Sequence, residues 1–343
     1  MANLRTPLTG RWFLAVAAIS LVSIAGGYLA AWSTRGEPAA PVALLAPAEN
    51  PPASPSILNA SSDPSQSQAR SRPSTQPARY PSDQLIKDTR EAGRKLQTRL
   101  DSSFHVLTFP PFVVAGNLPE DRIRQYAQWS ILRPAEALWK SYFQVRGQEV
   151  ITVLLFADEA SYRGWAKKLF KDEDVSYYGY YRHNDRTLVM NIGTGTGTLV
   201  HELTHALIVY DWPNVPLWFN EGLASLHEQC QVQDDHITGL PNWRLPGLQK
   251  AVSDGRLRSL ADLAGKGDFY GPLRGLNYAH ARYFCLYLQQ RGLLKEFYQK
   301  YQAGFAKGIS PEKVMREVTG LSMPDLDAQL QKFVQSLRFG EGR

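Results

Sequence analysis

Two short polar motifs inside strongly apolar sequence place the tightest constraint on the fold of this 343-residue chain. The first is HELTH at residues 201–205, flanked by Leu, Val, Ala and Ile. Apolar residues at nearly every flanking position predict a buried helix. On a helix, His201 and His205 share one face about 5–6 Å apart, so their imidazoles can hold one metal ion. Glu202 is placed to take a proton from a metal-bound water.

The second motif lies in PLWFNEGLASLHE at residues 216–228, eleven residues further along the chain. This stretch also predicts a buried helix, in which the carboxylate of Glu221 needs a partner or a metal. The turn-rich connection at 211–216 lets the second helix fold back on the first, so Glu221 becomes a third ligand. The fourth position stays open for water. The alternative interpretation is two buried histidines satisfied by backbone carbonyls.

HELTHAL followed by PLWFNEGLA resembles the gluzincin metallopeptidases, in particular the small bacterial group described as peptidase MA-like. The resemblance covers residues 177–292 most clearly. It implies a zincin-like fold and one zinc ion bound by His201, His205 and Glu221. It also implies that Glu202 is the general base.

A peptidase also needs a group that stabilises the oxyanion of the tetrahedral intermediate. Residues 276–288 (LNYAHARYFCLYL) resemble the helix that follows the site in this family, where a Tyr or His has that role. Tyr278 is the first candidate and His280 the second. The alternative for Tyr278 is a purely structural position in the core. The tyrosines of residues 177–181 could form an edge strand that pairs with an extended substrate.

The N-terminal part of the chain has the composition of a membrane tether. Residues 1–11 are short and basic, and residues 12–32 carry no charge over about the length that crosses a bilayer. The basic flank predicts a cytoplasmic N-terminus, so we expect a single-pass protein of the inner membrane with its folded part on the periplasmic side. A cleaved signal peptide is the alternative. Residues 33–82, rich in Pro, Ala and Ser, are expected to be a disordered linker.

The remaining residues, 83–343, are expected to form one metallopeptidase-like domain of the α+β class. Its first half combines a small mixed sheet with helices, and the chain after Glu228 is expected to be helical almost to its end. Strands are predicted at residues 104–109, 112–115, 150–156, 177–181 and 187–191, and helices at 84–100, 120–142, 157–170, 245–255, 277–291, 293–301, 311–319 and 323–337.

The net charge and the cysteine content narrow the possible functions of the chain further. The net charge of +6 is spread along the chain, so nucleic-acid binding is not expected. The only cysteines, Cys230 and Cys285, could form a disulfide in an oxidising compartment or remain buried thiols.

The sequence therefore predicts a membrane-anchored zinc endopeptidase that acts on peptide or protein substrates. The alternative is a non-catalytic, zinc-stabilised binding or assembly module of the cell envelope. The two differ at the fourth metal position, which is open in an enzyme and filled by a side chain such as His280 or Glu228 in a scaffold. The oligomeric state is not predicted.

Overall fold

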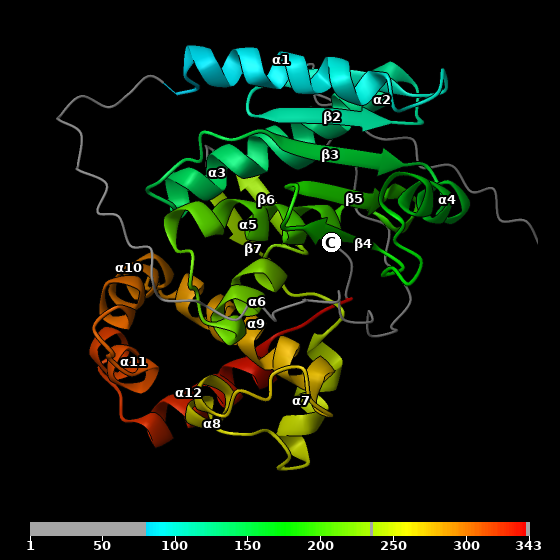
Figure 1. Cartoon of the computed structure of the whole chain (residues 1–343). Helices are drawn as coiled ribbons and strands as arrows, with labels where there is room; N and C mark the ends of the chain where they lie inside the picture. The colour runs from blue at the N-terminus through cyan, green and yellow to red at the C-terminus, as the bar shows by residue number, and fades with distance from the viewer. Residues whose placement is uncertain (1–79, 234–235, 341–343) are drawn as a thin grey trace, which may run out of the picture. The chain divides into compact units, whose positions relative to one another are not determined.

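A computed structural model describes residues 80–233 and 236–340. These residues form an α+β structure with a small sheet and a mostly helical C-terminal half, as predicted (Figure 1). The first half contains, in order, α1 (Asp83–Gln97), β1 (His105–Phe109), β2 (Phe112–Gly116), α2 (Glu120–Tyr126), the π-helical turn η1 (Ala127–Leu132), α3 (Arg133–Ser141), β3 (Ile151–Phe156), α4 (Glu159–Phe170), β4 (Gly179–Arg182) and β5 (Thr187–Asn191).

The five strands form one mixed sheet in the order β1-β2-β3-β5-β4. The central pairs β2–β3 and β3–β5 are parallel, whereas β1 and β4 join the two edges in antiparallel pairs. Side chains of the central strand β3 alternate between the two faces of the sheet. Val153 and Leu155 face the core that contains α3 and α5, and Leu154 and Phe156 face the core beneath α1 and α4.

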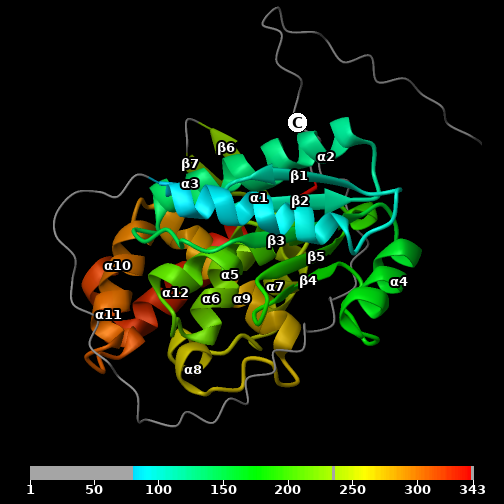
Figure 2. The same cartoon turned by 45° about the horizontal axis from the view of Figure 1, so that its top comes forward.

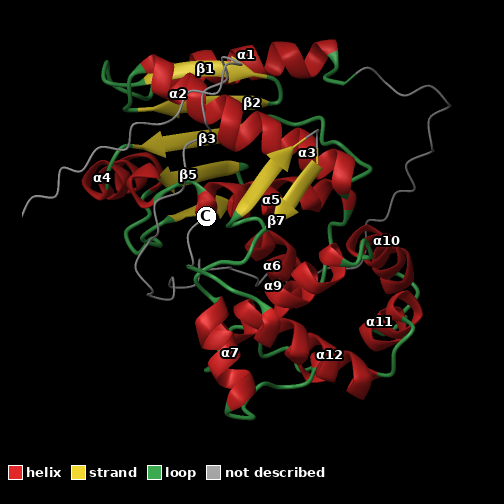
Figure 3. Cartoon of the chain, turned by 180° about the vertical axis from the view of Figure 1, so that it is seen from behind, coloured by secondary structure: helices red, strands yellow, loops and turns green. Residues whose placement is uncertain are grey.

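The second half begins with the single turn η2 (Ile192–Thr194) and is helical apart from one hairpin (Figure 3). In order, its elements are α5 (Gly197–Asp211), α6 (Leu217–Leu226), β6 (Cys230–Gln233), β7 (His236–Gly239), α7 (Leu245–Ser253), α8 (Leu260–Gly265), α9 (Arg274–Gln290), α10 (Leu294–Phe305), α11 (Pro311–Thr319) and α12 (Met323–Ser336). Helix α5 packs on β4 and β5, and α6 packs between α5 and α9.

Two stretches differ from the predicted elements. The helix expected at 120–142 is interrupted by the π-helical turn at 127–132, which the 3.6-residue periodicity does not reveal. The chain after Glu228 was expected to be helical almost to its end, but its first two elements are the strands of the β6–β7 hairpin. Apolar and polar residues alternate through CQVQ and HITG, a strand pattern that overrides the helical expectation. Cys230 and Cys285 are free thiols.

The expected localisation, a single-pass protein of the inner membrane, is contradicted. Over residues 80–233 and 236–340 no helix is long and apolar enough to cross a membrane. A spanning helix needs about 20 consecutive apolar residues, whereas the longest helix of this part of the chain, α9, has 17 residues and contains Arg274 and Arg282. The segments expected at 1–11 and 12–32 and the linker up to residue 79 lie outside the described residues.

Candidate metal centre

Helices α5 and α6 carry the three candidate ligands, and the packing of these helices positions them. Residues Leu199–Ile208 of α5 are all buried, so the helix is surrounded by protein along most of its length. Asp211 at its C-terminal end accepts hydrogen bonds from the Tyr298 hydroxyl at 2.7 Å and from the backbone N–H of Gln144 at 2.8 Å. These contacts hold the corner after which the chain reverses into α6.

Close packing against α9 fixes α6 from the other side. Gly222 lies directly against α9, where an added Cβ would stand 3.0 Å from the carbonyl oxygen of Ala281. The fully buried guanidinium of Arg282 donates to the carbonyls of Ser225 and Leu226 at the C-terminal end of α6. Glu221 therefore projects from a helix whose position is fixed at several points.

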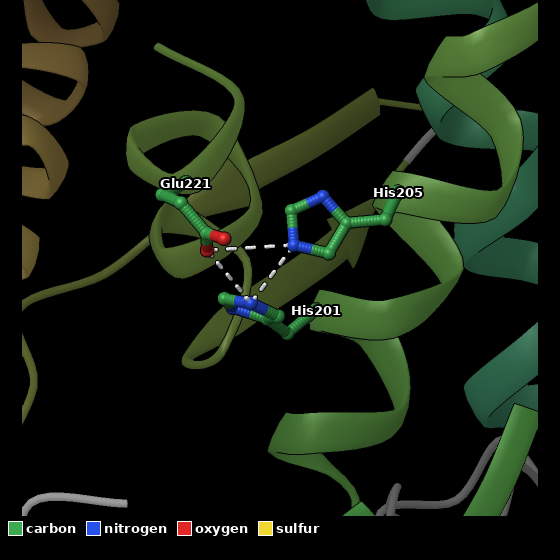
Figure 4. Close-up of side chains that lie close together, drawn as sticks. All are labelled: His201, His205 and Glu221. Atoms are coloured by element: carbon green, nitrogen blue, oxygen red, sulfur yellow. Dashed lines mark hydrogen bonds and ion pairs between the residues drawn. The ribbon is translucent and has the colours of Figure 1, made fainter. Parts of the chain in front are cut away.

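His201, His205 and Glu221 converge on one point (Figure 4). The two Nε2 atoms of the histidines are 3.1 Å apart, and Glu221 Oε2 lies 3.3 Å from His201 Nε2 and 3.4 Å from His205 Nε2. A tetrahedral ion with bonds of roughly 2.0–2.1 Å separates neighbouring ligand atoms by about 3.3–3.4 Å. The three atoms thus already stand at the spacing that one such ion requires.

The hydrogen bonding of Glu221 is also what a metal ligand requires. Its Oε1 accepts a hydrogen bond of 2.5 Å from the Tyr270 hydroxyl, whereas its buried Oε2 has no hydrogen-bond partner. A buried carboxylate oxygen without a partner is costly, and a cation removes that cost. No backbone carbonyl bonds either histidine ring among the described residues, so the alternative of two carbonyl-satisfied histidines does not describe this site. The buried group can bind a metal ion.

Outer partners orient the two imidazoles. His205 Nδ1 lies 2.9 Å from Asn220 Oδ1, a partner that keeps the proton on Nδ1 and directs the Nε2 lone pair to the centre. His201 Nδ1 lies 3.4 Å from Glu228 Oε1, an ion-pair distance rather than a hydrogen bond. Glu228 is itself held by Arg244 through contacts of 2.8 and 3.0 Å and by Asn242 at 3.2 Å.

Burial and charge shift the pKa values of these groups in opposite directions. Burial alone would lower the pKa of His201, but the carboxylates of Glu221 and Glu228 outweigh it and raise the pKa to about 10. Burial would raise the pKa of Glu221, but the neighbouring His205 and His201 hold it well below its usual range. Without a metal, the site therefore retains a proton as its cation, and a metal ion would have to displace that proton.

Glu202 lies beside the ligand group and does not belong to it. It is buried, and this burial raises the pKa of its carboxyl group. The charges of His201 and His205 oppose this shift in its pKa, and a hydrogen bond from the backbone N–H of Tyr181 in β4 opposes it less strongly. A carboxylate with a raised pKa next to a metal site is suited to accept and return protons near neutral pH.

Two tyrosines, Tyr270 and Tyr278, lie close to Glu221. The ring of Tyr278 lies 6.4 Å from that of His201, and after burial the charge of Glu221 is the largest influence that raises its pKa. Tyr270, which donates to Glu221, was not predicted from the sequence. The adjacent aromatic rings of Phe269 and Tyr270 ahead of α9 are the only local signal for it, and that signal is weak.

The side chains considered as a fourth ligand do not join the group. His280 is buried, and burial lowers its pKa to about 3, but its ring does not reach the three ligand atoms. Glu228 is engaged by Arg244 and faces the Nδ1 side of His201. Within residues 80–233 and 236–340, three protein ligands converge and no fourth one does.

No family model matches the chain, and no curated protein is significantly similar to it.

The first prediction concerns metal content. We expect the purified full chain to bind one divalent ion. The variants His205→Ala and Glu221→Ala should each weaken metal binding by more than roughly 100-fold, which is the upper range for loss of a residue that only orients a ligand. That ion at about 100 times its Kd should stabilise the wild-type fold by about 2.7 kcal/mol. Elemental analysis and thermal unfolding measure both quantities. His105→Ala, an exposed histidine on β1, is the control and should change neither.

The second prediction concerns the Glu228–Arg244 pair. Glu228→Gln leaves the buried guanidinium of Arg244 without a counter-charge and should cost about 3–5 kcal/mol in urea unfolding of the metal-free protein. Adding Arg244→Met should recover most of this loss. Arg244 lowers the pKa of Glu228 to about 2 from 4.5, so this stabilisation is present above pH 4.5 and disappears as the pH falls through 2. A Glu228→Gln variant whose deficit stays constant across that window would contradict the assignment.

Proposed function

We propose that this chain is a zinc-dependent endopeptidase of the gluzincin type, with a zincin-like fold, as its two motifs suggest. One observation carries the proposal: three buried ligand atoms stand 3.1–3.4 Å apart, and a second carboxylate, that of Glu202, lies beside them without joining them. Two imidazole nitrogens and one carboxylate oxygen form a donor set that suits zinc, and three protein ligands are the number used by catalytic zinc.

Each residue has a distinct part in the proposed reaction. Zinc, when bound, would polarise the scissile carbonyl and lower the pKa of a water molecule toward 7. Glu202 takes a proton from the attacking water and passes it to the leaving amine nitrogen. Its buried position supports this part, because desolvation brings the pKa of the carboxyl group closer to the working pH. Asn220 and Glu228 keep the two imidazoles oriented.

The position of β4 supports action on internal peptide bonds. β4 is an edge strand of the sheet, and the backbone N–H of its Tyr181 bonds Glu202. An extended substrate that pairs with this strand would bring its backbone past the metal centre without presenting a chain end. The absence of a fourth ligand among the described residues favours the enzyme over a purely structural metal site.

The third prediction tests the general base. Glu202→Gln is close to isosteric, leaves the three ligands in place and should retain the metal. Hydrolysis of a quenched fluorescent peptide library should fall by about 10²–10⁴-fold, the usual contribution of a proton-transfer group. Metal content measured on the same samples separates loss of chemistry from loss of the ion. Full activity in a metal-loaded Glu202→Gln protein would rule out this mechanism.

The fourth prediction separates the two tyrosines. Tyr278→Phe should lower kcat by about 10²–10³-fold, as loss of an oxyanion donor does, and should reduce metal affinity less than Tyr270→Phe. Tyr270→Phe removes the hydrogen bond to Glu221 Oε1 and should weaken metal binding by about 10–100-fold. Zinc titrations and steady-state kinetics on both variants give the comparison. The reverse pattern would exchange the two roles.

A further inference from the structure

A concave site outside the metal centre lies between the first helix, α1, and the strand β1. β1 and β4 form opposite edges of the sheet. The site is a pocket of about 350 Å³ between α1 and β1. Figure 2 shows α1 lying along β1 and β2. Six residues line the pocket: Arg90, Gly93, Arg94, Gln97, Val106 and Thr108.

The spacing of the lining residues along the sequence matches the repeat of a helix in α1 and of a strand in β1. Arg90, Arg94 and Gln97 are four and three residues apart and so share one face of α1, while Val106 and Thr108 share one face of β1. Gly93 allows the helix to lie close to the strand, because an added Cβ would stand 2.7 Å from Thr108 Cγ2. The pocket is thus a groove with a helical wall and a strand along its side.

The strand that borders this groove has a free edge. β1 pairs with β2 on one side, and no backbone hydrogen bond joins its other side to any segment that the structure describes. In an antiparallel pair, every second residue points its N–H and C=O away from the partner strand. β1 therefore offers unpaired backbone groups alongside the groove, as a template for one more strand.

The helical wall is positively charged. Arg90 and Arg94 are exposed and form no ion pair with a described residue, whereas the neighbouring Glu91 pairs with Lys95 at 2.6 Å. Four residues of helix rise about 6 Å. Alternate side chains of an extended strand are about 6.6–6.8 Å apart. Two acidic side chains on one face of an added strand would therefore match the two guanidinium groups.

We propose that this groove binds an extended acidic polypeptide segment of another protein, which adds to β1 as a strand and places alternate carboxylates against Arg90 and Arg94. A second copy of the chain is a poorer occupant. Antiparallel pairing of β1 with β1 would bring the arginine faces of both α1 helices toward each other, and like charges repel. The proposal does not depend on the metal centre or on peptidase activity.

The fifth prediction uses the full chain and a labelled peptide as probe. A fluorescein-labelled decapeptide in which Glu alternates with Thr and Val should bind, with fluorescence anisotropy as the readout. The same peptide with Gln in place of Glu should bind at least about tenfold more weakly, and binding should weaken with salt. N-methylation of alternate backbone nitrogens should also abolish binding, because strand addition needs those N–H groups.

Matched variants test the residues. Arg90→Glu with Arg94→Glu should weaken binding at least about tenfold, while Lys313→Glu with Arg316→Glu, the same charge change on exposed positions of α11, should not. Thermal unfolding checks that both variants fold. If either does not fold, the peptide comparisons on the wild-type chain still test the proposal. Equal binding of the Glu and Gln peptides, tolerance of N-methylation, no binding at millimolar peptide, or a β1-mediated dimer that excludes the peptide would each overturn the proposal.

Discussion

Burial of charged and polar groups between α5 and α6 is the constraint on which the rest of the C-terminal half depends. His201, His205 and Glu221 lie where water has little access, and each would be costly there alone. They offset that cost by converging on one point, where a proton or a metal ion balances the carboxylate. Small displacements of either helix would separate ligand atoms that now stand 3.1–3.4 Å apart.

The surrounding packing explains how two short helices keep that geometry. Asp211 and the aromatic cluster around Trp212 fix the corner between them. The close approach at Gly222 and the buried guanidinium of Arg282 tie α6 to α9. The pair formed by Glu228 and Arg244 continues this network to the Nδ1 side of His201. Residues other than the three ligands thus determine whether the centre is preformed.

Much of this architecture follows from local sequence patterns, with three exceptions. The helices over 201–205 and 217–226 and the alternating strands of the sheet are visible as periodicity, and the carboxylate of Glu221 stands out as a lone charge in apolar sequence. The β6–β7 hairpin, the π-helical turn and the hydrogen bond from Tyr270 to Glu221 were not predicted. The π-helical turn and the Tyr270 hydrogen bond leave no periodic signal in the sequence, and the alternation in CQVQ and HITG covers only four residues of each strand.

The sequence by itself predicted the three residues of the centre, because HELTH on a helix presents two imidazoles to one side and NEG on the next helix supplies a buried carboxylate. Only the tertiary structure decided which partners surround it. Tyr270 lies 49 residues from Glu221 and Arg244 lies 16 from Glu228, separations over which chain folding sets the contact. The same holds for the groove between α1 and β1, whose arginine wall and free strand edge become one surface only when helix and sheet pack together.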